Sequence, residues 1–181
     1  MSAHTIMSAG DMRRSLARIA HEILERNHGP EGLLVLGIHT RGVPIARRLA
    51  EKIGELEGIS QPWGEIDVSL SRDDVNRRPT RAVRPTRIPG DVTGATVVLV
   101  DDVLYTGRTI RAAMDVLFGY GRPRSIQLAA LVDRGHRELP IRADYVGKNV
   151  PTARGEEVRV RLSEIDGADE VEIRQVADVS A

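Results

Sequence analysis

The sequence predicts an α/β fold in which a central, mostly parallel sheet is flanked by helices. Short apolar runs alternate with segments whose apolar residues recur at helical spacing. The clearest run covers residues 97–100 and is followed, after a polar turn, by a helical pattern that begins near Thr109. A second run covers residues 33–38 and precedes a helix predicted over residues 43–56. Continuous apolar runs of this length are typical of parallel strands, which are buried on both faces.

Composition limits the class of protein. A length of 181 residues predicts one domain that spans residues 1–181. Because 41% of the residues are hydrophobic and 29% are charged, the chain is expected to be globular. The absence of cysteine excludes disulfides and thiol catalysis and favours the cytoplasm, and no apolar run is long enough to span a membrane. The 26 basic and 26 acidic residues balance, so nucleic-acid binding would require a local basic patch.

The first element is a helix predicted over residues 11–27, after a loose lead-in over residues 1–7. Ser8 and Asp11 have the spacing of a capping box, with aspartate in place of glutamate. The apolar stripe of this helix consists of Met12, Leu16, Ile19, Ala20, Ile23 and Leu24. Its other face carries Arg14, Arg18, His21, Glu22 and Arg26. From spacing alone, a solvated helix face explains those polar residues.

Later strands are predicted over residues 64–70 and 125–132, with shorter or irregular segments over 141–148, 157–162 and 170–174. Residues 71–90 have no apolar period. They contain six arginines, namely Arg72, Arg77, Arg78, Arg81, Arg84 and Arg87. A loop of this length is usually a functional lid or a hairpin, and arginines on a closing lid would neutralise phosphate and exclude water. A disordered basic insertion is the alternative.

The residues after the run 97–100 have the chemistry of a ribose 5-phosphate site. Asp101 and Asp102 would accept hydrogen bonds from sugar hydroxyls. Residues 106–109, Thr-Gly-Arg-Thr, offer hydroxyls and backbone N–H groups at the positive end of a helix, where Gly107 permits close approach. Ligands of open α/β sheets bind at this end of the strands. The alternative is an acid pair that caps a strand, followed by an ordinary helix start.

Two more strand ends are expected at the same crevice. Thr40 and Arg41 follow the run 33–38 and place a hydroxyl and a cation before the next helix. Asp133 and Arg134 follow the strand predicted over residues 125–132 and are candidates to hold a base or phosphates.

Residues 97–109 resemble the phosphoribosyl pyrophosphate (PRPP) motif of type I phosphoribosyltransferases, which combines an apolar run, two acids and Thr-Gly-x-Thr. The resemblance implies the type I phosphoribosyltransferase fold with a flexible lid loop and a small hood. It also implies Mg²⁺ held through PRPP rather than by protein side chains. The residues expected to bind PRPP or nucleotide are Thr40, Arg41, Arg84, Asp101, Asp102, Val103, Leu104, Tyr105, Thr106, Gly107, Arg108, Thr109, Arg134 and Val158.

Residues 13–22, 37–42, 101–109 and 131–151 together closely resemble the bacterial pyrimidine operon regulators, a family within this fold. The resemblance implies binding of the leader RNA of pyrimidine mRNA, favoured by UMP or UTP, and conversion of uracil and PRPP to UMP. It implies catalytic roles for Asp101, Asp102 and Arg41, and a homo-oligomer, dimeric or larger. The residues expected to contact RNA are Arg14, Arg18, His21, Arg26, Arg137, Arg142 and Lys148.

The physical support for RNA binding is a ridge of phosphate donors, because Arg14, Arg18 and His21 lie four and three residues apart on one helix. With only 3% aromatic residues, base stacking would come mostly from arginine planes. Ser71 replaces the tyrosine, and Ala153 the serine, that the family commonly has. Two alternatives stay open: a salvage phosphoribosyltransferase without RNA binding, and a nucleotide-sensing regulator without turnover.

Overall fold

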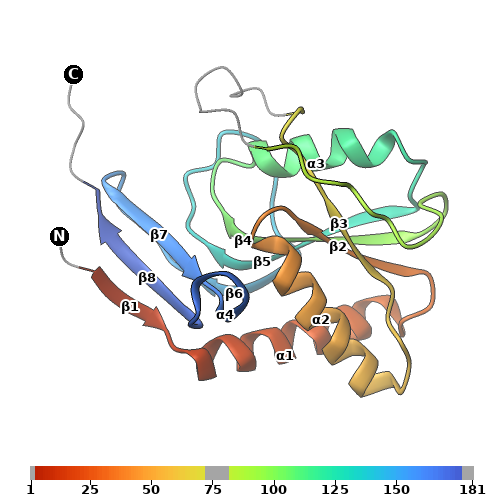
Figure 1. The fold of residues 1–181 in the computed structure, drawn as a ribbon, viewed down its shortest axis with the longest axis horizontal. Coiled ribbons are helices and arrows are strands. Elements are labelled where there is room, and N and C mark those ends of the chain that lie inside the picture. The colour runs from red at the N-terminus through yellow and green to blue at the C-terminus, as the bar shows by residue number, and fades with distance from the viewer. Residues whose placement is uncertain (1–2, 72–81, 177–181) are drawn as a thin grey trace.

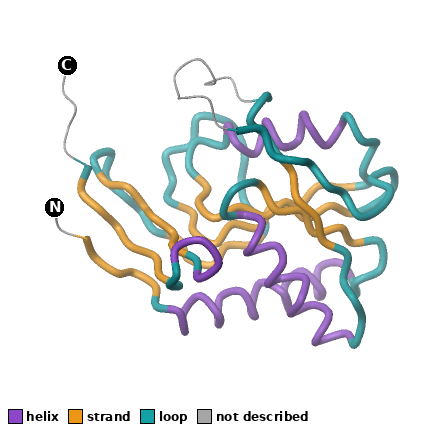
Figure 2. Tube along the Cα trace, viewed as in Figure 1, coloured by secondary structure: helices purple, strands orange, loops and turns teal. Residues whose placement is uncertain are grey.

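The computed structural model describes residues 3–71 and 82–176, which form two sheets (Figure 1). The larger sheet has the strand order β3-β2-β4-β5-β6, and all its pairings are parallel. Its strands are β2 (Leu33–Ile38), β3 (Trp63–Ile66), β4 (Thr96–Leu104), β5 (Ser125–Asp133) and β6 (Tyr145–Asn149). Helices α1 (Ala9–Asn27) and α2 (Gly42–Glu57) cover one face, and α3 (Arg108–Phe118) covers the other (Figures 1 and 2). The predicted α/β fold is confirmed.

Alternate residues of the central strands enter two separate apolar clusters. Val98 and Val100 pack with α1 and α2, whereas Val97 and Leu99 pack with α3. Because both faces of the sheet are covered, every residue of β2 is buried. This arrangement explains why the strands appear in the sequence as continuous apolar runs.

The second, smaller sheet is antiparallel, has the order β1-β8-β7, and lies at the end of the molecule where both termini are found (Figure 1). It consists of β1 (Ala3–Met7), β7 (Glu156–Arg161) and β8 (Glu170–Gln175), with the short helix α4 (Ser163–Asp166) between β7 and β8. We call this sheet and α4 the hood. The predicted loose lead-in was therefore wrong for residues 3–7, because Ala3 pairs with the distant Arg174.

The predicted capping box of α1 is confirmed. Ser8 Oγ accepts a hydrogen bond from the Asp11 amide at 3.2 Å, and Asp11 Oδ2 accepts one from the Ser8 amide at 2.9 Å. All six residues of the predicted apolar stripe are buried. The hydrogen bonds from Ser8 and then from Arg14 lower the pKa of Asp11 to about 2, which keeps the capping carboxylate ionised.

Two features differ from the expected elements. The strand predicted over residues 64–70 ends at Ile66, because Asp67 accepts hydrogen bonds from the amide and the hydroxyl of Ser69 and so forms a turn. Helix α4 had no counterpart in the expected elements. Within the described ranges, no helix is both long and apolar enough to cross a membrane.

Candidate functional site

The two aspartates lie on β4 itself, which continues past the apolar run of residues 97–100. The strand continues to Leu104 because Leu104 pairs with Asp133 of β5. Each carboxylate accepts a hydrogen bond from the amide of the next residue: Asp101 Oδ1 from Asp102 and Asp102 Oδ1 from Val103, both at 2.9 Å. These bonds hold two acceptors at the carboxyl edge of the sheet, where ligands of such folds bind.

The loop after β4 turns into the N-terminus of α3 at Gly107. Gly107 has φ of 93°, in the left-handed region that favours glycine, and it caps the helix, which begins at Arg108. The Arg108 amide lies 3.3 Å from Thr106 Oγ1 and donates to it. The helix terminus and the hydroxyl therefore lie together, as is expected for the predicted phosphate site.

The chain that follows β5 supports this loop. The carbonyl oxygen of Thr106 accepts hydrogen bonds from the amides of Glu138 and Leu139, at 3.0 and 3.2 Å. Arg108 Nε lies 2.7 Å from Glu138 Oε2, and Arg137 Nη1 donates to the Tyr105 carbonyl oxygen at 2.7 Å. The loop that we expect to bind the 5-phosphate is thus fixed by residues 137–139.

Arg134 links that loop to the hood. Its guanidinium carbon lies 4.1 Å from the centre of the Tyr105 ring, and its Nη2 donates to the Glu156 carbonyl oxygen at 2.8 Å. Arg134 is buried by these contacts. The side chain of Val158 is buried in the apolar core, so its predicted contact with a base would have to use the backbone.

A second loop, residues 39–41, connects β2 to α2 and lies against β4. A Cβ atom on Gly42 would lie 2.4 Å from the Val100 carbonyl oxygen, and one on Gly37 would lie 2.5 Å from the Gly42 carbonyl oxygen. Both glycines are therefore required for this close approach. The packing places Thr40 and Arg41 beside the strand that carries the two aspartates, and the His39–Thr40 peptide bond is cis.

Residues 65–67, before the predicted lid of residues 71–90, pair with residues 84–87 near its end. The backbones of Glu65 and Arg87 exchange hydrogen bonds of 2.9 and 2.8 Å, and the Asp67 amide donates to Thr86 Oγ1 at 3.0 Å. The Arg84 amide donates to Asp67 Oδ2 at 2.6 Å, and the Arg84 residue is exposed. The other predicted lid arginines, Arg72, Arg77, Arg78 and Arg81, lie outside the described residues.

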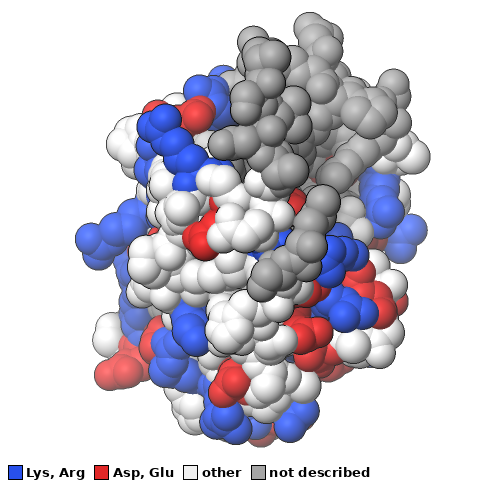
Figure 3. All heavy atoms as spheres, turned by 90° about the vertical axis from the view of Figure 1, so that its left-hand side faces the viewer, with Lys and Arg blue, Asp and Glu red and all other residues white. Residues whose placement is uncertain are grey.

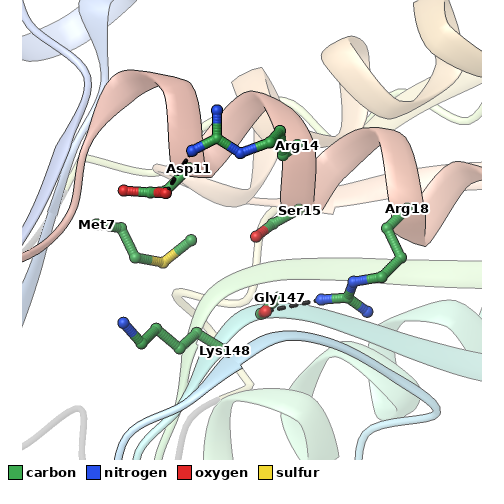
Figure 4. Close-up of a pocket in the computed structure, with 7 residues that line it drawn as sticks. All are labelled: Met7, Asp11, Arg14, Ser15, Arg18, Gly147 and Lys148. Atoms are coloured by element: carbon green, nitrogen blue, oxygen red, sulfur yellow. Dashed lines mark hydrogen bonds and ion pairs between the residues drawn. The ribbon is translucent and has the colours of Figure 1, made fainter.

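A separate basic face is formed where α1 packs on β6. Arg18 Nη2 donates to the carbonyl oxygens of Val146 and Gly147, at 3.0 and 2.8 Å, and Lys148 Nζ donates to the Ile6 carbonyl oxygen at 2.8 Å. A pocket of about 310 Å³ lies between α1 and β6, with Arg14 and Lys148 on opposite sides (Figure 4). It is lined by Met7, Asp11, Arg14, Ser15, Arg18, Gly147 and Lys148.

The other residues predicted to contact RNA are placed differently. Arg26 extends the face along α1 and forms an ion pair of 2.6 Å with Asp144, while His21 and Arg142 are exposed. Arg137 belongs to the loop that braces the predicted phosphate-binding loop, where its Nη2 lies 2.6 Å from Asp133. On the hood side of the molecule, basic and acidic side chains are interspersed (Figure 3). Arg14, Arg18 and Lys148 are thus brought together at the pocket, and Arg137 is not.

Several supporting contacts had no signal in the sequence. Glu138, Thr152 and Asp166 brace predicted site residues, yet each is far in sequence from the residue that it contacts. The Asp166 carboxylate holds Arg41 across 125 positions of the chain. Among residues 3–71 and 82–176, no three His, Asp or Glu side chains group as a metal site.

The fold and the family match define the class of protein: the chain belongs to the phosphoribosyltransferases, and the family model described as "Phosphoribosyl transferase domain" matches residues 3–164. Within it, the chain belongs to the bifunctional PyrR proteins. It is 58% identical to "Bifunctional protein PyrR" of Deinococcus radiodurans, over 97% of this chain and 96% of that protein. It is 62% identical to the protein of the same name from Thermus aquaticus, over 93% of each chain.

Solved structures support the fold. A hypoxanthine-guanine phosphoribosyltransferase from Bacillus anthracis matches with a TM-score of 0.69 and 19% identity, over 97% of this chain and 100% of that one. The hypoxanthine phosphoribosyltransferase of Trypanosoma cruzi matches with a TM-score of 0.70 and 18% identity, over 96% of this chain and 97% of that one. At this identity the likeness concerns the fold alone.

Proposed function

We propose that this chain is a uridine-nucleotide-responsive, RNA-binding regulator of pyrimidine biosynthetic genes that also converts uracil and PRPP to UMP and pyrophosphate. The observation that carries the proposal is the pairing of two separate sites. The carboxyl ends of β2, β4 and β5 combine fixed carboxylates with a helix N-terminus. A basic face with a pocket lies between α1 and β6. That the chain belongs to the bifunctional PyrR proteins agrees with both sites.

The chemistry requires charge stabilisation rather than a covalent intermediate. A uracil ring nitrogen forms a bond to C1 of the ribose and releases its proton to the departing pyrophosphate or to water, while the bond from C1 to pyrophosphate breaks through an oxocarbenium-like state. Asp101 and Asp102 hold the ribose hydroxyls and stabilise the positive charge on the sugar. Residues 106–109 bind the 5-phosphate. Positioning of the two reactants supplies much of the rate.

The departing pyrophosphate would be neutralised at the second loop and the lid. Thr40 and Arg41 lie after β2, and Arg84 lies near the end of the predicted lid. Mg²⁺ carried by PRPP would add positive charge at the leaving group, and the carboxylate oxygens of Asp101 and Asp102 are ligands of the kind that this ion accepts.

RNA affinity would come first from phosphate contacts. Arg14, Arg18 and Lys148 surround the pocket between α1 and β6, where a phosphate group could approach several cations at once. Such contacts give salt-dependent binding, whereas sequence recognition would rely on unpaired bases. We further propose that UMP or UTP favours RNA binding, and that the chain forms one domain, works in the cytoplasm and assembles as a dimer or a larger homo-oligomer.

A gel shift with pyrimidine leader RNA, with and without UMP and over a series of salt concentrations, tests the regulatory half of the proposal. An assay with uracil and PRPP tests the catalytic half. We expect a salt-sensitive shift that UMP strengthens, together with UMP synthesis. Turnover without a shift would make the chain a salvage enzyme, and a shift without turnover would make it a regulator that only senses nucleotides.

We predict that trypsin cleaves within residues 71–90 in the absence of ligand, and that PRPP with Mg²⁺ protects this segment. Its arginines would bind PRPP phosphates, and bound residues are withdrawn from a protease. Mass spectrometry of the fragments over time is the measurement. A sample with sodium chloride at equal ionic strength is the control, and equal cleavage with PRPP and with salt would rule out the lid role.

A further inference from the structure

An ion pair joins the hood to the proposed pyrophosphate loop. Arg41 Nη2 lies 2.9 Å from Asp166 Oδ1 and 3.2 Å from Asp166 Oδ2, so both carboxylate oxygens use the same guanidinium nitrogen. Asp166 is well shielded, since its side chain is 11% exposed, against 29% for Arg41. Arg41 Nε is buried and has no hydrogen-bond partner within the described part of the chain.

The carboxylate that holds Arg41 is itself fixed. Asp166 Oδ2 accepts a hydrogen bond from the Leu162 amide at 3.0 Å. That bond is the main cause that lowers the pKa of Asp166 below its usual value; burial opposes the shift and Arg41 adds to it. The group is therefore a firmly held anion at neutral pH.

Helix α4, which carries Asp166, is anchored to α2 by a second arginine. Arg48 Nε lies 2.9 Å from Glu164 Oε1, and Arg48 Nη1 and Nη2 lie 3.0 and 2.8 Å from the Asp169 carboxylate. The Ser163 amide also donates to Asp169 at 2.8 Å. Arg48 and Asp169 hold the helix without touching Arg41, so the anchor and the Arg41 contact can be tested separately.

The Asp166 carboxylate is an anion beside the proposed pyrophosphate site, so it should repel the ligand. A benefit to pyrophosphate binding would have to outweigh that repulsion. A guanidinium has five N–H donors in a planar fork, and an arginine side chain loses considerable rotamer freedom when a ligand orders it. Because Asp166 uses only Nη2 and Nε is buried, Nη1 remains for a phosphate group, and its direction is already set.

We propose that Asp166 is a positioning residue for pyrophosphate, which holds the Arg41 guanidinium so that Nη1 faces the leaving group of PRPP. The proposal rests on the proposed function, in which Arg41 binds pyrophosphate. The effect of Asp166 is to pre-organise a donor, which lowers the entropic cost of binding. The opposite possibility is that Asp166 competes with pyrophosphate for Arg41.

The two possibilities predict effects of opposite sign for Asp166→Asn. Asparagine keeps the size of the side chain but removes the charge that orients Arg41. If Asp166 positions Arg41, inhibition of UMP synthesis by inorganic pyrophosphate should weaken about tenfold, and KM for PRPP should rise by a similar factor, because a charge-assisted hydrogen bond is lost. If Asp166 competes, pyrophosphate should inhibit more strongly. Unchanged or stronger inhibition overturns the proposal.

Three further variants distinguish the causes. Asp169→Asn removes an equal charge from the same hood segment and should lower the thermal midpoint without weakening pyrophosphate inhibition. Asp166→Glu keeps the charge. Its inhibition by pyrophosphate should therefore be closer to that of the unmodified chain than the inhibition of Asp166→Asn is. This variant keeps the test valid if Asp166→Asn folds poorly. Arg41→Ala tests the underlying role: unaltered inhibition there would reject Arg41 in the proposed function. A loss in Arg41→Ala but not in Asp166→Asn would reject the positioning role alone.

Discussion

Replacing Asp101 or Asp102 with asparagine should lower kcat/KM for UMP synthesis by roughly two orders of magnitude, since loss of a group that stabilises transition-state charge costs about 3 kcal/mol. Both carboxylates lie at the carboxyl edge of β4, beside the loop that caps α3. Positive charge grows on the ribose as pyrophosphate leaves, so an anion near the sugar stabilises the transition state more than the bound substrate.

The fold should survive these changes. Each carboxylate uses Oδ1 to accept the amide of the following residue, at 2.9 Å, and the asparagine carbonyl oxygen can accept the same bond. The thermal midpoint measured beside kcat/KM checks this expectation. Asp115→Asn is a matched control, because Asp115 lies on the exposed side of α3 and pairs with Arg111 at 3.3 Å. Near-normal turnover in both Asp101→Asn and Asp102→Asn would contradict the assignment.

Arg18→Ala should weaken binding of pyrimidine leader RNA and reduce the salt dependence of that binding by nearly one unit of slope, because one phosphate contact is lost. UMP synthesis should be retained, since Arg18 lies on α1 and contacts Glu22, Val146 and Gly147, away from the loops after β2 and β4. His21→Ala should also weaken RNA binding, because His21 is exposed on the same helix. Alanine favours helix, so α1 should remain folded.

Arg47→Ala provides the matched control for Arg18→Ala. Arg47 pairs with Glu51 at 2.8 Å and Arg18 pairs with Glu22 at 2.7 Å, and both pairs are spaced i,i+4 on partly exposed helices. Arg47 lies on α2, outside the predicted RNA face. The measurement is RNA affinity over a salt series, with UMP synthesis assayed on the same preparations. If Arg18→Ala and Arg47→Ala lowered the affinity equally, the effect would be one of net charge and not of a specific face.

Local patterns in the sequence were sufficient for the elements that carry the site. Ser8 and Asp11 predicted the start of α1, and the apolar run of residues 33–38 coincides with β2. The glycine before Arg108 predicted the turn into α3, and its φ of 93° agrees. These features depend on residues within a few positions of one another: caps, apolar periods and turn residues act through short backbone distances.

Features that depend on distant segments were decided only by the tertiary structure. Residues 3–7 form a strand because β8 lies beside them, and β4 continues past its apolar run because β5 pairs with it up to Asp133. The sequence by itself determined which residues offer hydroxyls, carboxylates and cations at the ends of the strands. It did not determine what holds them, since the contact of Arg41 with Asp166 spans 125 positions and that of Arg18 with Gly147 spans 129. Side-chain contacts over such separations leave no periodic pattern, because they depend on how the hood and β6 pack against the rest of the fold.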